Sequence, residues 1–211
     1  MRTLFLNPNS SAEITSTLRR HVERCGWPAD RWEILKVDDA PRIIGSVSQN
    51  AEAEAAVERA LPVLSRGFDR VVMMSSLDTG YHIARQRLGD EAYGFTRSVF
   101  SQHRRLGRQL QIITFDKSMT SLYESAIDAT GHRMVVAGWT VVDLEPAAIA
   151  AQPSLALEKL RTVCRDLAST SIHPIFVVGA VGLALTEELR RVGMTGLVDP
   201  VSDLLAWLGS P

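Results

Sequence analysis

Four short polar or glycine-rich segments follow apolar runs in this sequence, and they hold the side chains best suited to chemistry. The first segment, residues 7–11, reads Asn-Pro-Asn-Ser-Ser and precedes an amphipathic run. Asn7 and Ser11 could hydrogen-bond a small carboxylate, and the N–H groups and partial positive charge of a helix N-terminus would help to hold it. The alternative is that Ser10 or Ser11 only caps the helix.

The second segment begins at Ser75 and places two hydroxyl groups and a carboxylate at the end of an apolar run. Ser75 could act as a nucleophile or hydrogen-bond donor and Ser76 could bind substrate, with Asp78 or His82 as the nearest acid–base group. The alternative is that Asp78 or Thr79 caps a helix and His82 is a surface residue. The segment lacks the Gly-x-Ser-x-Gly turn that presents many nucleophilic serines.

The third and fourth segments offer binding groups more than reactive ones. Thr114 could hydrogen-bond a ligand, whereas Asp116 fits the cap of the next helix. The fourth segment, residues 179–183, reads Gly-Ala-Val-Gly-Leu, so the backbone at Ala180 and Val181 could approach an anion closely. The alternative is tight packing of a strand against a helix, because the segment is neither a dinucleotide fingerprint nor a phosphate-binding loop.

A scaffold must bring these segments together, and the hydrophobic pattern predicts an α/β fold. Short β-rich runs alternate with longer amphipathic runs, which indicates right-handed βαβ units and parallel sheets. The runs at 70–74 and 174–178 have the apolar character of strands that are covered on both faces. The expected strands are 3–6, 32–37, 70–74, 111–114, 134–136 and 174–178, and the expected helices are 14–25, 51–64, 80–88, 119–129, 154–167, 184–192 and 201–208.

The two halves of the chain repeat the same order of strand, turn and helix. This repetition predicts two similar lobes with a boundary near residues 95–98. Ligands of open α/β sheets bind beyond the carboxyl ends of the strands, where all four polar segments are expected.

Composition excludes several other classes of protein. The chain has 211 residues and a net charge of -1, which gives no reason to expect nucleic acid or an anionic membrane as partner. Cys25 and Cys164 are too few and too far apart for a disulfide framework or a zinc site, and their helical surroundings suggest core thiols. The sequence shows neither a signal peptide nor a run long enough to span a membrane, so we expect a cytoplasmic protein.

The order of five segments resembles that of the hydantoin racemases, and through them the aspartate/glutamate/hydantoin racemase superfamily. Residues 7–15 resemble that family's Asn-Pro-Asn-Thr-Ser-x-x-Met-Thr opening, and residues 41–46 resemble its Gly-Pro-x-x-Ile loop. Residues 75–80 resemble its Cys-Phe-Gly-Asp-Pro-Gly segment, and residues 179–183 resemble Gly-Cys-Ala-Gly-Met. Residues 198–200 resemble the Ile-Asp-x that precedes the last helix.

The resemblance implies two pseudo-symmetric Rossmann-like lobes, each with a parallel sheet flanked by helices and with the active site in the cleft between the lobes. Because the last helix would return to the first lobe, we expect residues 1–96 and 199–211 in the N-terminal lobe and residues 97–198 in the C-terminal lobe. The resemblance also suggests a homo-oligomer, and it implies neither a cofactor nor a metal.

The sequence departs from the family at the two cysteines that exchange protons with the α-carbon. Ser75 and Ala180 stand at these positions. Alanine has no proton to exchange, and a serine hydroxyl is less acidic than a thiol by about five pKa units.

We therefore expect a cysteine-independent enzyme that acts on a small carboxylic acid or cyclic amide. It would stabilise an enolate or oxyanion in an isomerisation, lyase or hydrolysis reaction. Two alternatives remain, a non-catalytic protein that binds small carboxylates and a racemase of amino acids or hydantoins that uses other bases. Beside the catalytic candidates named above, the expected substrate-binding residues are Asn7, Ser11, Ser76, Thr114, Ala180 and Val181.

Overall fold

The computed structural model describes residues 1–144, 149 and 151–209, and the chain forms two compact units. The first unit comprises residues 1–99 together with the chain from Val201 onward, and the second unit comprises Phe100–Pro200. The sequence suggested the slightly different boundaries 96/97 and 198/199. In the part of the chain that the structure describes, no helix combines the length and apolar character needed to span a membrane.

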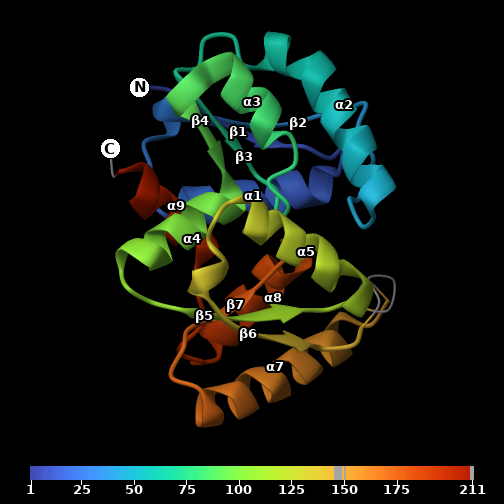
Figure 1. The fold of residues 1–211 in the computed structure, drawn as a ribbon, viewed down its shortest axis with the longest axis vertical. Coiled ribbons are helices and arrows are strands. Elements are labelled where there is room, and N and C mark those ends of the chain that lie inside the picture. Colours follow the sequence, from blue (N-terminus) through green and yellow to red (C-terminus); the bar gives the residue numbers. More distant parts are fainter. Residues whose placement is uncertain (145–148, 150, 210–211) are drawn as a thin grey trace. The chain divides into compact units, whose positions relative to one another are not determined.

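The first unit is built on a four-stranded sheet in the order β2-β1-β3-β4, and all neighbouring strands are parallel (Figure 1). Leu6 pairs with both Leu35 and Met73, so β1 lies between the second and third strands of the chain. The four strands are β1 (Thr3–Asn7), β2 (Trp32–Lys36), β3 (Arg70–Met73) and β4 (Ala92–Gly94).

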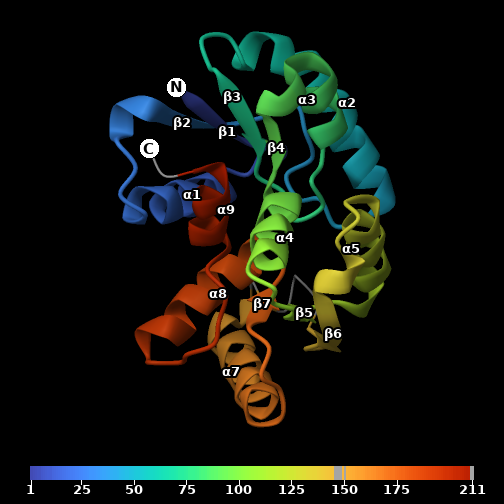
Figure 2. The ribbon, with the colours of Figure 1, turned by 60° about the vertical axis from the view of Figure 1, so that its left-hand side comes forward.

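Helices cover both faces of this sheet because the side chains of β1 alternate between the faces. Leu4 and Leu6 pack with residues of α2 and α3, whereas Phe5 packs against the rings of Trp27 and Trp32. Figure 2 shows α1 and α9 next to one another, and a contact of 3.6 Å between Cys25 Sγ and Ser202 Oγ joins them. The helices are α1 (Ala12–Arg24), α2 (Val47–Leu64), α3 (Tyr81–Leu88) and α9 (Pro200–Leu208), with 3-10 turns η1 (Ala29–Arg31) and η2 (Gly89–Glu91).

The second unit is built on a three-stranded parallel sheet in the order β6-β5-β7. Ile113 and Val177 form one core with residues of α7 and α8, and on the opposite face Phe176 meets Phe100 edge to face. The elements are β5 (Leu110–Thr114), β6 (Val136–Val141), β7 (Ile175–Val177), α5 (Lys117–Ala129), η3 (Arg133–Val135), α7 (Pro153–Thr170) and α8 (Ala180–Arg191). The predicted α/β fold with two parallel sheets flanked by helices is therefore confirmed.

Three local predictions were wrong. The strand expected at 134–136 is the η3 turn, and β6 follows it from Val136. The short β4 and the helix α4 (Phe95–Arg105) were not predicted, because three residues carry no clear period and the domain boundary was expected there. Helix α8 begins at Ala180, four residues before the expected start at 184.

We expect the substitution Gly182→Ala to lower the free energy of unfolding by about 1–3 kcal/mol, because the site is overpacked by any side chain. A Cβ atom at Gly182 would lie 2.7 Å from Val177 Cγ1 and 2.9 Å from the Val177 carbonyl oxygen. Urea denaturation measures the change. Gly45→Ala is the control, since its Cβ would meet Gln49 Oε1 at an ordinary 3.5 Å. Equal stability of the two variants would contradict the packing argument.

Candidate functional site

Strand order creates one topological switch point in each sheet. The chain leaves β1 toward β2 on one side, whereas β3 lies on the other side, so the connections diverge at the carboxyl ends of β1 and β3. The carboxyl ends of β5 and β7 form the equivalent point in the second unit. Ligands of open α/β sheets bind at such points. The four segments selected from the sequence follow these four strands.

The turn after β1 is shaped by its own amide side chains. The buried Asn7 Nδ2 donates to Asn9 Oδ1 and Thr15 Oγ1, both at 2.9 Å. Ser11 caps α1, because its Oγ accepts a hydrogen bond of 3.2 Å from Ile14 N. The capping alternative is thus confirmed for Ser11, and the Asn7 amide group holds the turn.

Asn9 is a residue that the sequence reasoning did not select. Its Oδ1 accepts from Asn7 and, at 2.9 Å, from the backbone N–H of Ser11. Within the described residues the Asn9 Nδ2 group makes no hydrogen bond. Its N–H bonds are therefore available to a ligand oxygen at the edge of the sheet. The Asn-Pro-Asn pattern was the available signal, since an asparagine side chain often accepts a hydrogen bond from the backbone two residues on, as Asn7 and Asn9 both do.

The Ser75 hydroxyl belongs to a chain of three hydrogen-bonding side chains. Ser75 Oγ lies 2.9 Å from Thr79 Oγ1, which donates at 2.7 Å to Asn50 Oδ1. Because Thr79 has one hydroxyl hydrogen, Ser75 must donate its own hydrogen to Thr79. Ser75 Oγ also accepts from Leu77 N at 3.2 Å. The chain ends at an amide oxygen, which cannot serve as a base, so this arrangement favours hydrogen bonding by Ser75 over nucleophilic attack.

The contacts of His82 and Ser76 do not support a catalytic pair of Ser75 and His82. The His82 side chain is 60% exposed, and its Nδ1 lies 3.6 Å from Glu54 Oε1. The Ser76 carbonyl oxygen accepts a hydrogen bond of 2.7 Å from Thr96 Oγ1, which fixes the turn after β3 against the start of α4.

Asp78 has a structural role that the sequence did not reveal. Its carboxylate is buried and accepts from Thr96 N at 2.8 Å, Arg97 N at 3.1 Å and Arg97 Nε at 3.1 Å. It therefore caps α4, whereas the N-cap of α3 is Gly80. Burial raises the pKa of Asp78 to about 6, although Arg97 opposes the shift. A Cβ atom at Gly94 would lie 2.6 Å from this carboxyl group, so the glycine gives it room.

The turns of the second unit hold fewer polar side chains. Thr114 is buried, and its Oγ1 makes a long hydrogen bond of 3.5 Å to the Asp116 carbonyl oxygen. Asp116 caps α5 through Ser118 N at 2.8 Å, as the alternative interpretation predicted. Ala180 is the first residue of α8 and half-buried, and Val181 is exposed.

Tyr123 is the second residue that the sequence reasoning missed. A Cβ atom at Gly179 would lie 3.4 Å from the Tyr123 hydroxyl, which places the phenol beside the start of α8. Burial and the charge of Asp116 raise the pKa of Tyr123 to about 12, so the phenol keeps its proton at neutral pH. In the described residues it makes no hydrogen bond. The only signal was its place two helical turns after Asp116, on the same helix face.

The cysteines lie away from the strand-end turns. Cys25 is the C-cap of α1, opposite the helix end at Ser11, and its Sγ donates to the His21 carbonyl oxygen at 3.3 Å. It is half-buried, so the prediction of a core thiol was wrong for Cys25. Cys164 is buried within α7, and burial raises its pKa to about 12. Among the described residues no three His, Cys, Asp or Glu side chains are grouped to hold a metal ion.

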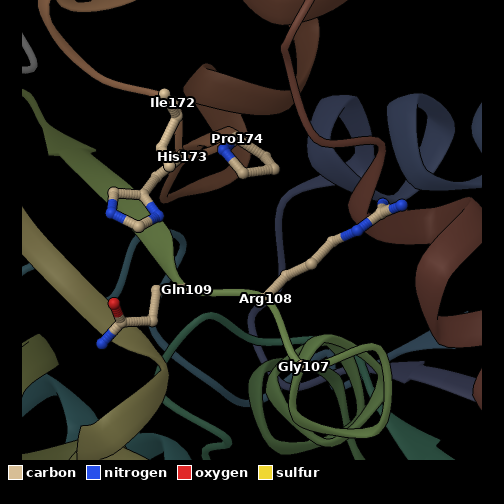
Figure 3. Close-up of a pocket in the computed structure, with 6 residues that line it drawn as sticks. All are labelled: Gly107, Arg108, Gln109, Ile172, His173 and Pro174. Atoms are coloured by element: carbon tan, nitrogen blue, oxygen red, sulfur yellow. The ribbon is translucent and has the colours of Figure 1, made fainter.

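A cavity of about 410 Å³ lies at the opposite edge of the second sheet, where the chain enters β5 and β7 (Figure 3). Its lining includes Arg108, Gln109 and His173. Figure 3 shows the Arg108 side chain extending away from the other two. The polar groups of this cavity do not converge, and the cavity lies at the amino ends of parallel strands. Neither feature is typical of a ligand site.

Comparisons with known proteins agree with this fold. The model of the Asp/Glu/Hydantoin racemase family matches residues 4–206, as the order of sequence motifs predicted. No curated protein matches the sequence. Allantoin racemase from Klebsiella pneumoniae superposes with a TM-score of 0.84 at 21% identity, over 100% of this chain and 86% of that chain.

Two further solved structures show the same fold. Allantoin racemase from Pseudomonas fluorescens gives a TM-score of 0.83 at 19% identity, over 99% of this chain and 89% of that chain. Unliganded arylmalonate decarboxylase gives a TM-score of 0.56 at 14% identity, over 100% of this chain and 94% of that chain.

We expect Asp78→Asn to lower the free energy of unfolding by about 1–3 kcal/mol at neutral pH, because an amide group would turn N–H bonds toward the N–H donors of α4. The raised pKa of Asp78, about 6 against 3.8, means that the native state binds a proton more tightly than the unfolded state. This group therefore contributes more stability as the pH falls, and that contribution is lost as the pH rises through the native pKa.

The deficit of Asp78→Asn relative to the wild type should consequently widen between about pH 7 and about pH 4.5, measured by urea denaturation. Asp90→Asn removes an exposed carboxylate that also pairs with an arginine, and it should change stability by less than about 0.5 kcal/mol. A stability deficit of Asp78→Asn that shrinks on acidification would contradict the raised pKa of Asp78.

Proposed function

Because this chain belongs to the Asp/Glu/hydantoin racemase family, we propose that it is an enzyme that acts on a small carboxylic acid or cyclic amide. It stabilises an enolate or oxyanion with hydrogen-bond donors at the carboxyl edge of a sheet and uses no cysteine. The observation that carries the proposal is the set of donors at the switch points, while both thiols lie elsewhere.

Each unit offers such donors by itself, Asn9 and Ser75 in the first unit and Tyr123 in the second. Asn9 Nδ2 and the Tyr123 hydroxyl make no hydrogen bond within the described residues. Ser75 donates to Thr79, and on binding it would exchange the Thr79 oxygen for a ligand oxygen. Donors fixed before the reaction stabilise developing negative charge without the cost of reorienting solvent, which is commonly the largest contribution to catalysis.

Among the reactions open to such a site, loss of carbon dioxide from a malonate-type acid needs the fewest bases. The bond between the α-carbon and one carboxylate breaks, carbon dioxide leaves, and the electron pair remains as an enediolate. One proton must then reach the α-carbon. Within the second unit the protonated Tyr123 phenol, beside the start of α8, is the candidate donor, and it would regain a proton from water. The similarity to arylmalonate decarboxylase agrees with this reaction class.

Racemisation is the reaction named for two of the similar structures. It requires a base on one face of the α-carbon and an acid on the other. Asp78 is occupied by three donors and His82 faces Glu54, so neither is positioned as a base by its observed contacts. This difference is why we place a lyase reaction ahead of racemisation.

A non-catalytic protein that binds small carboxylates is the second candidate. The observation that favours it is the Ser75 proton, which is directed to Thr79 and not toward a base. Binding without turnover across phenylmalonate, hydantoin, allantoin and α-amino acids would establish this candidate and exclude the enzyme.

We further propose that the protein is cytoplasmic, needs no cofactor and forms a homo-oligomer. The family resemblance supports the last two of these features. Light scattering of the purified protein and assay after dialysis against a chelator test the last two.

We expect Ser75→Ala to reduce turnover of phenylmalonate, followed as carbon dioxide release, about 100-fold, because removal of one oxyanion donor commonly has an effect of this size. Ser16→Ala removes an exposed hydroxyl from α1 and should retain full activity. Unchanged turnover in Ser75→Ala would remove Ser75 from the mechanism. Deuterium exchange at the α-carbon of hydantoins or amino acids, in the absence of carbon dioxide release, would replace the lyase with a racemase.

We expect Tyr123→Phe to reduce turnover at least about tenfold, because it removes the proposed acid while it preserves the ring. The hydroxyl has no hydrogen-bond partner in the described part of the chain, so the free energy of unfolding should change by less than about 0.5 kcal/mol. Stopped-flow assays and urea denaturation measure the two quantities. Loss of stability with full activity would assign Tyr123 a structural role only.

A further inference from the structure

Arg97 presents a cation at the same sheet edge as Ser75, in the first turn of α4. Its Nε donates to Asp78 Oδ2 at 3.1 Å, and its guanidinium carbon lies 3.4 Å from the centre of the Tyr81 ring. The hydrogen bond from Thr96 Oγ1 to the Ser76 carbonyl oxygen ties this helical turn to the turn that carries Ser75. The guanidinium is therefore fixed in orientation, and its helical turn is tied to the turn that carries Ser75.

The Nη1 and Nη2 groups of this guanidinium form no hydrogen bond with the described residues. The backbone N–H and Nε of Arg97 bond Asp78, and none of the described residues accepts from Nη1 or Nη2. The side chain is 27% exposed and neither Nη atom is among the buried polar atoms that lack a partner, so these four N–H bonds are accessible, whereas Asp78 is only 5% exposed. Asp78 also occupies the N–H groups of Thr96 and Arg97, so the N-terminus of α4 is not itself the anion site.

We propose that the two Nη groups of Arg97 bind a carboxylate of the substrate and make the chain select acids over neutral cyclic amides. This inference rests on the proposed function and narrows its substrate class. The planar fork of arginine matches the two oxygens of a carboxylate, and contact with Asp78 and Tyr81 reduces the entropy lost when that bond forms. A lysine would provide charge at this place but not the paired geometry.

The competing explanation is that Arg97 only neutralises the buried Asp78. In that case replacement of Arg97 would change stability and leave the preference between acids and amides unchanged. Ligand selectivity, measured on folded protein, therefore separates the two explanations.

The test measures dissociation constants by isothermal titration calorimetry for two matched pairs of probes, phenylmalonate with phenylmalonamide and hydantoin-5-acetate with hydantoin-5-acetamide. We expect the wild type to prefer each acid at least about tenfold. Arg97→Gln should weaken binding of the acids about ten- to hundredfold and change binding of the amides less than about threefold. Arg97→Lys should recover part of the loss.

Arg85→Gln is the matched control, because Arg85 also pairs with an aspartate and lies on α3, and it should leave all four dissociation constants unchanged.

If Arg97→Gln does not fold, the preference of the wild type for acids and the binding constants of Arg97→Lys decide between the two explanations. Equal affinity of the wild type for acids and amides, or no binding of any probe, would overturn the inference. Acid-selective binding that depends on Arg97 but leads to no turnover would support the role of Arg97 and overturn the proposed enzyme. Turnover of hydantoin that does not depend on Arg97 would support the enzyme and overturn the role of Arg97.

Discussion

The buried carboxylate of Asp78 is the interaction on which the candidate site depends. A charge in the interior is costly unless donors surround it, and here two backbone N–H groups and one guanidinium N–H meet the two oxygens. The same carboxylate starts α4, holds the turn after β3 in place and orients Arg97. Asp78 adopts a positive φ of 52°, which only a few residue types tolerate, so the turn depends on this residue in backbone as well as side chain.

This arrangement separates structural polar groups from those that can meet a ligand. Asn7, Ser11 and Asp78 direct their hydrogen bonds inward and fix the turns. None of the described residues accepts a hydrogen bond from Asn9 Nδ2, the Tyr123 hydroxyl or the Nη groups of Arg97. Nearly all of these groups donate hydrogen bonds and few can accept a proton. Such groups stabilise an anion better than they remove a proton from carbon, which favours chemistry that begins with the departure of a carboxylate.

Much of the fold could be predicted from the sequence because alternating short apolar runs and amphipathic runs leave few arrangements. Positions of the four polar segments at strand ends followed from the same alternation. The roles of individual residues did not follow, because they depend on contacts between distant parts of the chain. Asp78 meets Thr96 and Arg97 across 18 and 19 positions, and α4 itself was not predicted. Tyr123 was missed for the same reason, since its neighbour Gly179 lies on a different strand-end turn.

A titration of isotope-labelled protein with phenylmalonate, followed through the chemical shifts of the backbone amides, shows whether donors at a strand end bind the acid. Saturable shifts centred on the turn from Ser75 to Thr79 are expected, also in a protein whose two cysteines have been replaced by alanine. Shifts confined to the cavity around Arg108 and His173, or their loss on replacement of the cysteines, would contradict an anion site built from strand-end donors without a thiol.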